Sequence, residues 1–302
     1  MEKAFPIPFH TTWNAHDSSK ITTYMTCRRK YFYLYLLGWA PDTPSLPLVH
    51  GEAWHRGMEK LLLDRSNIDG AIDAYTNYYR RFYGQDLDDD YAPRSPKGIL
   101  ESYVTWLAKY KDDTFRVLHT EVSGFVITSA KSSLNFRIDA IIEDKDGIWV
   151  LDHKTTGSTS NIYAEHFIVS FQMLAYIHAA LMHFPDMPVQ GLIVNRSTFL
   201  KTRTEHERII IRKSPEMLGL WLAEAEDYLY DINQDIEKLS VTKDSDGVMI
   251  AFRRNTESCT KYFMMCPYFY FCSAWPNPLK RCHEVPVGFK QKWWDPSNRL
   301  ED

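Results

Sequence analysis

The middle of the chain constrains the fold most strongly. Residues 115–128, 134–142 and 148–153 alternate apolar and polar side chains with a period of two, which is typical of β-strands. Two further strand-like segments follow at 190–196 and 205–211, and helical patterns lie before, between and after these segments. Because strands and helices are mixed in this way, we predict an α/β fold with a mixed central β-sheet flanked by helices.

The helical patterns account for much of the remaining sequence. They cover about 21–37, 49–63, 69–83, 97–111, 162–183 and 215–239. The first helix should have Ser18 or Ser19 as its N-cap and should end at Gly38. The 302 residues allow one or two domains, and no linker-like segment divides the sequence. We therefore expect a single domain over residues 1–302, with an acidic, proline-containing surface loop at 85–96.

Charge and composition narrow the class of protein. The formal net charge of −4 argues against a protein that coats nucleic acid indiscriminately, but it allows a locally basic cleft. The first ten residues contain no basic segment followed by an apolar run, and no apolar stretch is long enough to span a bilayer. We therefore expect a cytoplasmic protein without a membrane partner. In that reducing compartment the five cysteines are more often thiols or metal ligands than disulfides.

Three charged residues at the end of the predicted hairpin suggest a metal site. Side chains alternate faces along a strand, so Asp152 and Lys154 point the same way, and the hairpin brings Asp139 close to Asp152. Two adjacent carboxylates repel each other unless a cation lies between them, and Mg²⁺ or Mn²⁺ prefers such oxygen ligands. Lys154 would neutralise charge on a phosphate, or help to position and deprotonate the attacking water. An isolated D-x-K is more often the charged end of a surface strand, so its surroundings decide.

These surroundings resemble the PD-(D/E)XK nuclease superfamily, and its RecB-like branch in particular. That branch has a helical histidine after a small residue, an acidic position on a strand, and an isoleucine–aspartate strand paired with an acidic-x-Lys-Thr strand. A Gln-x-x-x-Tyr helix follows. The matching text here is Gly51-Glu52-Ala53-Trp54-His55, Glu121, Arg137-Ile138-Asp139-Ala140, Leu151-Asp152-His153-Lys154-Thr155-Thr156 and Phe171-Gln172-Met173-Leu174-Ala175-Tyr176. The chain departs from the pattern at Ile138, which replaces the nominal proline, and at Asp152, which replaces Glu; the branch accepts both.

The resemblance implies roles for individual residues on a restriction-endonuclease-like core. Asp139 and Asp152 would hold Mg²⁺ or Mn²⁺, helped by His55 and by the backbone carbonyl of His153. Lys154 would act on the phosphate or the water. Glu121 would support the metal or its waters. Gln172 and Tyr176, which share a helix face at i, i+4 spacing, would position the scissile strand.

The function implied is that of a divalent-metal-dependent deoxyribonuclease. It would act as an exonuclease that hydrolyses phosphodiester bonds at the single-stranded or duplex ends of DNA in recombination, repair or phage DNA processing. Partners would be DNA and proteins of recombination or phage replication. A catalytically silent DNA-end-binding subunit of the same fold is the alternative. A sequence-specific restriction endonuclease is disfavoured because the sequence contains no separate recognition domain, and RNA stays open as a substrate because a fold alone does not fix it.

The cysteines suggest a second metal centre. Cys27 lies in the first predicted helix, and Cys259, Cys266 and Cys272 lie in an aromatic-rich tail. No C-x2-C knuckle is present, which argues against a common zinc ribbon, and four thiolates in an aromatic shell suit a [4Fe–4S] cluster. The arrangement resembles RecB-like nucleases that carry an iron–sulfur staple, with one cysteine before the nuclease core and three after it. We therefore expect the two ends, about 21–38 and 255–283, to be joined by a four-cysteine cluster, with Cys282 as the competitor of Cys259.

Overall fold

The computed structural model describes residues 5–129, 132–260 and 264–297. The chain divides into two compact units. The first, called the sheet unit, contains Thr43–Ser123 and Arg137–Leu218, and the second, called the terminal unit, contains Met1–Asp42, Gly124–Phe136 and Gly219–Asp302. Among the described residues, no helix is both long and apolar enough to cross a membrane.

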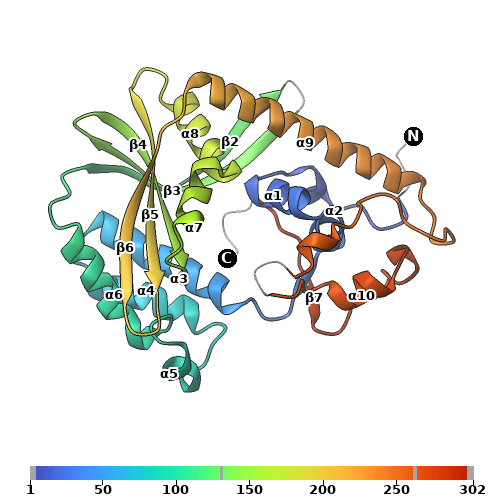
Figure 1. Cartoon of the computed structure of the whole chain (residues 1–302), viewed down its shortest axis with the longest axis horizontal. Helices are drawn as coiled ribbons and strands as arrows, with labels where there is room; N and C mark the ends of the chain where they lie inside the picture. Colours follow the sequence, from blue (N-terminus) through green and yellow to red (C-terminus); the bar gives the residue numbers. More distant parts are fainter. Residues whose placement is uncertain (1–4, 130–131, 261–263, 298–302) are drawn as a thin grey trace. The chain divides into compact units, whose positions relative to one another are not determined.

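The central sheet confirms the predicted mixed α/β fold (Figure 1). Within the described residues it has five strands in the order β2-β3-β4-β5-β6. Strands β3 and β4 are antiparallel, β4 and β5 are parallel, and β5 and β6 are antiparallel. The strands are β2 (Arg116–Ser129), β3 (Ser132–Asp144), β4 (Gly147–Thr156), β5 (Val189–Phe199) and β6 (Thr204–Ile211).

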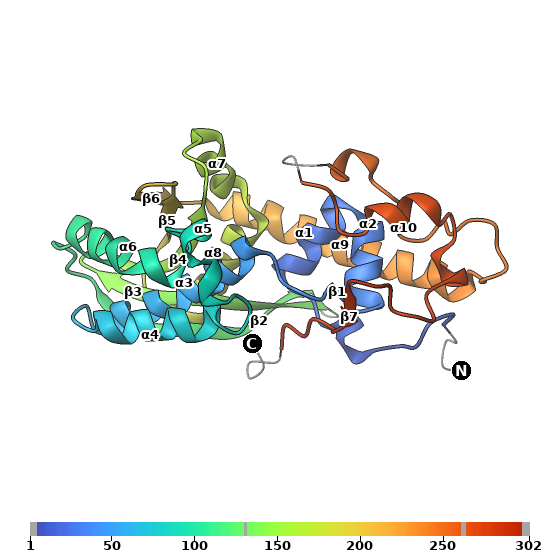
Figure 2. The ribbon, with the colours of Figure 1, turned by 90° about the horizontal axis from the view of Figure 1, so that it is seen from below.

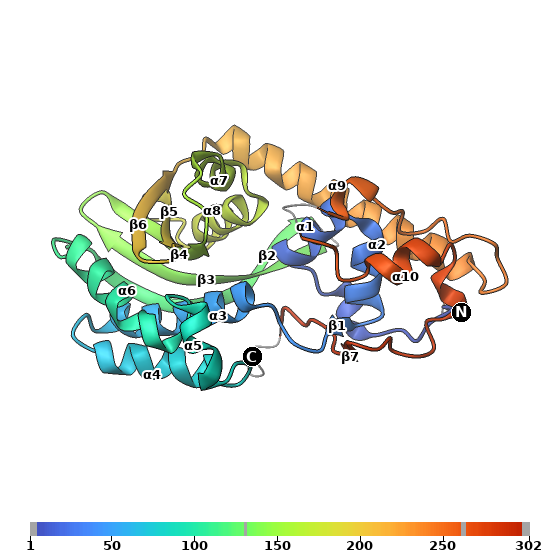
Figure 3. The same ribbon diagram turned by 60° about the horizontal axis from the view of Figure 1, so that its bottom comes forward.

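Helices cover both faces of the sheet in the sheet unit (Figure 3). One layer contains α3 (Leu46–Leu63), α4 (Ile68–Tyr79) and α6 (Pro96–Lys109), and the crossover between the parallel strands contains α7 (Asn161–His166) and α8 (Phe171–His183). A parallel pair needs such a crossover, because the chain must return to the same end of the sheet. The first layer is held by a buried apolar cluster that includes Trp54, Tyr103 and Leu151.

Two local predictions in the sheet unit were wrong. The helix expected at 162–183 is interrupted: η4 (Phe167–Val169) follows α7, and Ser170 adopts an extended backbone as the N-cap of α8. Serine favours that position over a helix interior because its hydroxyl competes for backbone hydrogen bonds. The loop expected at 85–96 contains η3 (Gln85–Leu87) and the short helix α5 (Asp88–Tyr91), where Asp88 forms an ion pair with Arg80.

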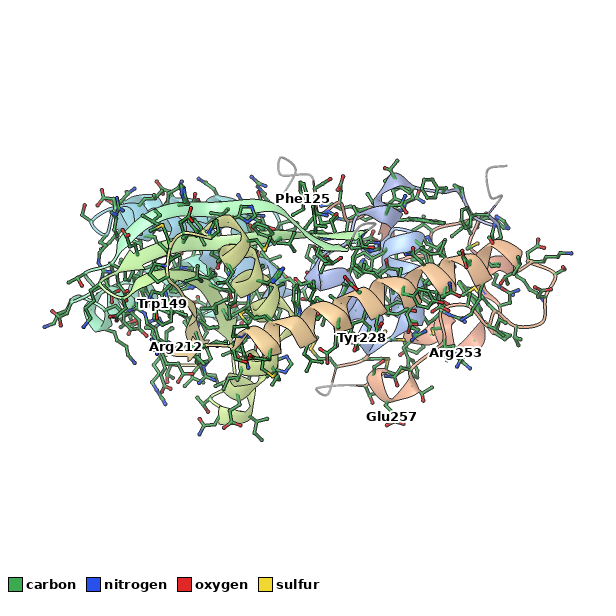
Figure 4. All side chains as sticks on the ribbon, turned by 90° about the horizontal axis from the view of Figure 1, so that it is seen from above. Phe125, Trp149, Arg212, Tyr228, Arg253 and Glu257 are labelled. Carbon is green, nitrogen blue, oxygen red and sulfur yellow. The ribbon has the colours of Figure 1, made fainter. Side chains whose placement is uncertain are left out.

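The last strand of the sheet is followed by the long helix α9 (Pro215–Val241). At this junction the guanidinium of Arg212 lies 5.0 Å from the centroid of the Trp149 ring, and Figure 4 labels both side chains. Such a cation–π contact stabilises the buried indole of a central strand against the end of β6. The prediction of a helix at 215–239 is confirmed, with two further residues at its C-terminal end.

The first predicted helix consists of three pieces in the terminal unit: α1 (Ser18–Thr26), α2 (Arg28–Tyr31) and the π-helical turn η2 (Phe32–Leu36). Its N-cap is Asp17, whose side chain accepts a hydrogen bond from the Lys20 N–H at 2.8 Å, so the choice of Ser18 or Ser19 was wrong. Cys27 interrupts the helix with an extended backbone (φ −162°, ψ 110°). Gly38 (φ +67°) ends the segment as predicted, since glycine adopts this conformation without strain.

The remaining terminal unit is built around aromatic side chains. Tyr33, Trp39, Phe252 and Tyr268 are all buried in one cluster, and Tyr268 donates a hydrogen bond to the Trp39 carbonyl at 2.6 Å. Short elements surround this cluster; they are η1 (Thr11–Asn14), β1 (Trp39–Pro41), η5 (Thr256–Ser258), α10 (Phe269–Ala274), η7 (Pro278–Lys280) and β7 (Phe289–Gln291). Strands β1 and β7 pair antiparallel (Figure 2), so the tail is more regular than its composition predicts.

Candidate active site

The β3–β4 pairing places Asp139 and Asp152 at the centre of the candidate site. Ala140 pairs with Leu151, and Asp139 and Asp152 are the next residues along the two strands. Ala140 and Leu151 belong to the apolar cluster under α3, so the aspartates occupy the alternate positions of each strand. The hairpin therefore brings the two carboxylates together, as the sequence predicts.

Asp139 receives two hydrogen bonds. Its Oδ1 lies 3.1 Å from Nδ1 of His55 on α3, and its Oδ2 accepts from the backbone N–H of His153 at 2.6 Å. Burial raises the pKa of Asp139, but the charge of His55 and its hydrogen bond outweigh burial, so the pKa lies below its usual range. Burial in turn lowers the pKa of His55, and Asp139 more than compensates, so the pKa of His55 is raised. The pair therefore favours an ionised carboxylate beside a protonated imidazole.

Asp152 is the more deeply buried carboxylate, with 1% of its surface exposed. Its Oδ2 lies 2.8 Å from Nζ of Lys154, so these two side chains share one face of β4 as predicted. Burial raises the pKa of Asp152 to about 6, Asp139 adds to this effect, and Lys154 opposes it. Burial lowers the pKa of Lys154, but the charges of the two aspartates raise it by more than burial lowers it. The ammonium therefore stays protonated.

This set of donors suits a divalent cation. Two adjacent buried carboxylates concentrate negative charge, and a hard ion would stabilise the ionised form of Asp152. In the structure, His55 and Lys154 contact the carboxylate oxygens. Among the described residues, no group of three or more His, Cys, Asp or Glu side chains converges closely enough to hold a metal ion. Asp139, Asp152 and His55 supply the nearest donors, but in this arrangement they do not form such a group.

His153 lies between Asp152 and Lys154 in the sequence but has a different environment. Its ring is buried, 6.0 Å from the ring of His55 and 6.5 Å from that of Trp106. Burial lowers the pKa of His153 to about 3, so the imidazole is neutral. Its backbone N–H is already engaged by Asp139, so the side chain belongs to the packed layer and the backbone belongs to the site.

The helix α8 presents Gln172 and Tyr176 together. Nε2 of Gln172 donates a hydrogen bond to the Tyr176 hydroxyl at 2.7 Å, which confirms that the two residues share a helix face. Tyr176 is 5% exposed. Because α8 packs on β4 and β5, this pair lies on the helix that covers the strand of Asp152.

Glu121 has a partner that sequence reasoning missed. Its Oε2 accepts a hydrogen bond from Nε of Arg137 at 2.5 Å, and Glu121 has a positive φ of 50°. Nη2 of Arg137 also lies 3.9 Å from Oε1 of Glu52, which in turn lies 3.2 Å from Nη2 of Arg56. The signal for Arg137 was its spacing: it stands two residues before Asp139 and so faces the same side of β3.

The cysteines fall into two groups by their neighbours. Burial raises the pKa of Cys266, and the nearby thiols of Cys27 and Cys259 raise it further. Burial also raises the pKa of Cys272 to about 11, with Cys27 and Cys266 adding to the effect. Cys282 has other surroundings: its thiol donates to the Leu279 carbonyl at 3.4 Å. Residues 261–263 of the expected clasp lie outside the described residues, and in the rest the four thiols do not form a closed metal-binding group.

A buried arginine lies beside these thiols. Nε and Nη2 of Arg29 donate to the carbonyls of Phe252 and Met249 at 2.9 and 3.0 Å. Its Nη1 is also buried and makes no hydrogen bond of standard geometry among the described residues, although Arg29 interacts with the Tyr33 hydroxyl. The positive charge of Arg29 lowers the pKa of Cys272. Arg29 therefore brings a buried positive charge close to Cys272.

A mixed sheet with paired aspartates and a lysine on its central hairpin defines a candidate phosphodiester hydrolase. A family model described as the PD-(D/E)XK nuclease superfamily matches residues 18–273. The chain therefore belongs to this superfamily, whose members are generally metal-dependent nucleases. The matched range includes residues of both compact units.

Solved structures include distant likenesses. The chain is similar to the protein in a structure titled "Crystal structure of SSO0001", with 14% sequence identity and a TM-score of 0.28. The similarity covers 70% of this chain and 84% of that chain. No curated protein matches the chain.

Proposed function

We propose that the protein is a RecB-like deoxyribonuclease that hydrolyses phosphodiester bonds at DNA ends with Mg²⁺ or Mn²⁺. The observation that carries this proposal is the geometry of the central hairpin, where Asp139 and Asp152 adjoin and Lys154 lies 2.8 Å from Asp152. The family match supports nuclease activity. Exonuclease action at DNA ends is the part of the proposal that goes beyond this match. Its setting would be recombination, repair or phage DNA processing.

In this proposal the carboxylates of Asp139 and Asp152, with His55 and the backbone carbonyl of His153, hold the divalent ion. A bound ion supplies electrostatic stabilisation for the phosphate and lowers the pKa of a water molecule. Asp139 is already ionised by its hydrogen bond to His55, so it presents charge at neutral pH. Asp152 must lose its proton, because its pKa is raised to about 6, and His55, whose pKa is raised as well, must lose its proton before its ring can bind the ion.

Lys154 and the α8 pair act on the substrate. The Lys154 side chain is 22% exposed, so its ammonium can exchange its contact with Asp152 for a scissile phosphate or an attacking water. Gln172 and Tyr176 are joined by their own hydrogen bond, which fixes the amide and the phenol relative to each other. We assign them to positioning of the scissile strand.

We further propose that Cys27, Cys259, Cys266 and Cys272 bind a [4Fe–4S] cluster that links the two ends of one nuclease domain over residues 1–302. The mutual electrostatic influence of these thiols and the buried positive charge of Arg29 support this ligand set, and the separate environment of Cys282 argues against Cys282. Thiolate ligation by iron suits a reducing, cytoplasmic location. The cluster would be structural, since it crosslinks segments far apart in the sequence.

A cleavage assay tests the nuclease proposal. End-labelled single-stranded and duplex DNA, with RNA as a third substrate, are incubated with the full chain in Mg²⁺, Mn²⁺ or EDTA. Release of short products from DNA ends in Mg²⁺ or Mn²⁺, and none in EDTA, is the expected result. Internal fragments would indicate an endonuclease, and DNA binding without cleavage would identify a catalytically silent DNA-end-binding subunit.

A further inference from the structure

A pair of charged side chains, Arg137 and Glu121, borders the candidate site. Arg137 stands two residues before Asp139 on β3, so its side chain leaves the strand on the face that carries Asp139. Almost half of its side chain, 48%, is exposed. A guanidinium has five N–H donors, and the hydrogen bond to Glu121 uses the one on Nε. The remaining donors are on an exposed group beside a predicted phosphate-cleaving centre, and one of the two nitrogens that carry them, Nη2, lies 3.9 Å from Oε1 of Glu52.

Glu121 holds the guanidinium from the neighbouring strand. The distance from Nε of Arg137 to Oε2 of Glu121 is 2.5 Å, and the carboxylate is 28% exposed. The backbone of Glu121 has φ 50°, a conformation that non-glycine residues seldom adopt. Unfavourable backbone of this kind tends to persist at binding and catalytic sites, where surrounding contacts fix it. The hydrogen bond therefore directs the carboxylate of Glu121 to Arg137.

We propose that Arg137 binds a substrate phosphate next to the scissile bond and that Glu121 is the positioning residue that fixes the Arg137 guanidinium. This inference rests on the proposed nuclease function and deepens it. Arginine suits the task because its planar fork matches the geometry of phosphate oxygens. Glu121 then acts through Arg137 and not through the metal ion.

The same two strands provide a matched control. Nη2 of Arg116 on β2 lies 2.6 Å from Oε2 of Glu143 on β3, and the side chain of Arg116 is 72% exposed. Glu143 stands next to the hairpin turn, at the end of β3 away from Asp139. This pair has the same chemistry and the same strands as Arg137–Glu121 but no place in the candidate site.

The experiment compares Arg137→Ala, Arg137→Lys and Glu121→Gln with Arg116→Ala and Glu143→Gln in the full chain. DNA binding in Ca²⁺ is measured over a range of salt concentrations, and single-turnover cleavage in Mg²⁺ is measured against DNA concentration. Arg137→Ala should weaken binding about tenfold and reduce the salt slope by about one contact, since each neutralised phosphate contributes about 0.7–0.9 to it. The cleavage rate at saturating DNA should change less than the DNA concentration that gives half of the maximal rate.

The remaining variants test the positioning role. Arg137→Lys should recover part of the lost affinity, and Glu121→Gln should weaken binding several-fold in the parent but not in the Arg137→Ala background. The Mg²⁺ concentration that gives half-maximal cleavage should be unchanged. Circular dichroism establishes folding, and Arg137→Gln replaces Arg137→Ala if the latter does not fold.

Two results would overturn the inference. If Arg137→Ala binds DNA with the affinity and salt slope of Arg116→Ala, Arg137 is only a surface ion-pair partner. If Glu121→Gln raises the Mg²⁺ requirement and leaves DNA binding intact, Glu121 supports the metal. Failure of the nuclease proposal is distinguishable, because the parent would then not cleave DNA, and the binding arm in Ca²⁺ alone decides the role of Arg137. A parent that neither cleaves nor binds DNA contradicts both proposals.

Discussion

Nζ of Lys154 lies 2.8 Å from Oδ2 of Asp152, on one face of β4. The ammonium has no lone pair while it is protonated, so it does not bind a metal ion itself. Its position instead suits contact with the scissile phosphate or the attacking water. The lysine and the aspartate therefore have separable roles, which variants of each can distinguish.

The first prediction concerns Lys154. Lys154→Ala should retain Mn²⁺ binding and DNA binding, while cleavage falls by about a hundred- to a thousandfold, the usual cost of losing one transition-state donor. Lys154→Arg should restore little activity, because the broad guanidinium differs in shape and does not act as a base. The measurements are calorimetric Mn²⁺ titration, DNA binding in Ca²⁺ and single-turnover cleavage in Mg²⁺. Cleavage at the parent rate by Lys154→Ala would show that the lysine is only a surface charge.

The second prediction concerns pH. The pKa of Asp152 is raised to about 6, so below that pH the carboxyl carries a proton that a metal ion must displace. Mn²⁺ affinity should therefore rise with pH from pH 5 by up to about tenfold per pH unit for each proton displaced, and it should level off only above the raised pKa of His55, which must also lose its proton to bind the ion. Calorimetric titration from pH 5 to 8 measures this, with Asp152→Asn as the control. A flat profile would contradict the raised pKa.

The third prediction concerns the cysteines. Protein purified without oxygen should be brown and contain iron and sulfide. Cys27→Ser, Cys266→Ser and Cys272→Ser should each lose iron and lower the thermal unfolding temperature, whereas Cys282→Ser should do neither. Metal analysis and thermal unfolding test this in parallel. Stoichiometric zinc without iron in such protein would refute the iron–sulfur assignment.

The fourth prediction concerns the packing of α3, the helix that carries His55. A Cβ at Gly57 would lie 1.8 Å from the Tyr103 hydroxyl and 2.9 Å from the Ala71 carbonyl oxygen. Gly57→Ala should therefore cost about 1–3 kcal/mol of the free energy of unfolding. Gly219→Ala on α9 is the control: nothing lies within 4 Å of its Cβ, and alanine should stabilise the helix by up to about 1 kcal/mol. Chemical denaturation measures the free energy of unfolding of both variants. Equal free energies of unfolding for the two variants would contradict the tight packing at Gly57.

The catalytic hairpin was predictable because its determinants are local. Alternation along two short strands and one turn places Asp139 beside Asp152 and Lys154 on the face of Asp152. The i, i+4 spacing likewise predicted the contact of Gln172 with Tyr176. Neither inference depends on residues far away in the sequence.

The features that sequence analysis missed depend on distant partners. The break of the first helix at Cys27 accompanies hydrogen bonds from Asn255 N–H to the Cys27 thiol at 3.4 Å and from Arg29 N–H to the Arg253 carbonyl at 3.1 Å. Helical periodicity contains no information on these contacts. The Arg137–Glu121 pair was missed for the same reason, because it depends on how β2 lies against β3.

The most direct test of the central claim is single-turnover cleavage of end-labelled DNA by Asp139→Asn and Asp152→Asn beside the parent. Asparagine keeps the shape of each side chain and removes the charge that holds a hard ion. The parent should cleave in Mg²⁺ or Mn²⁺, Ca²⁺ should support little turnover because its looser coordination positions water poorly, and both variants should be inactive in every metal. Undiminished cleavage by both variants would contradict the account, because the hairpin would then take no part in the chemistry.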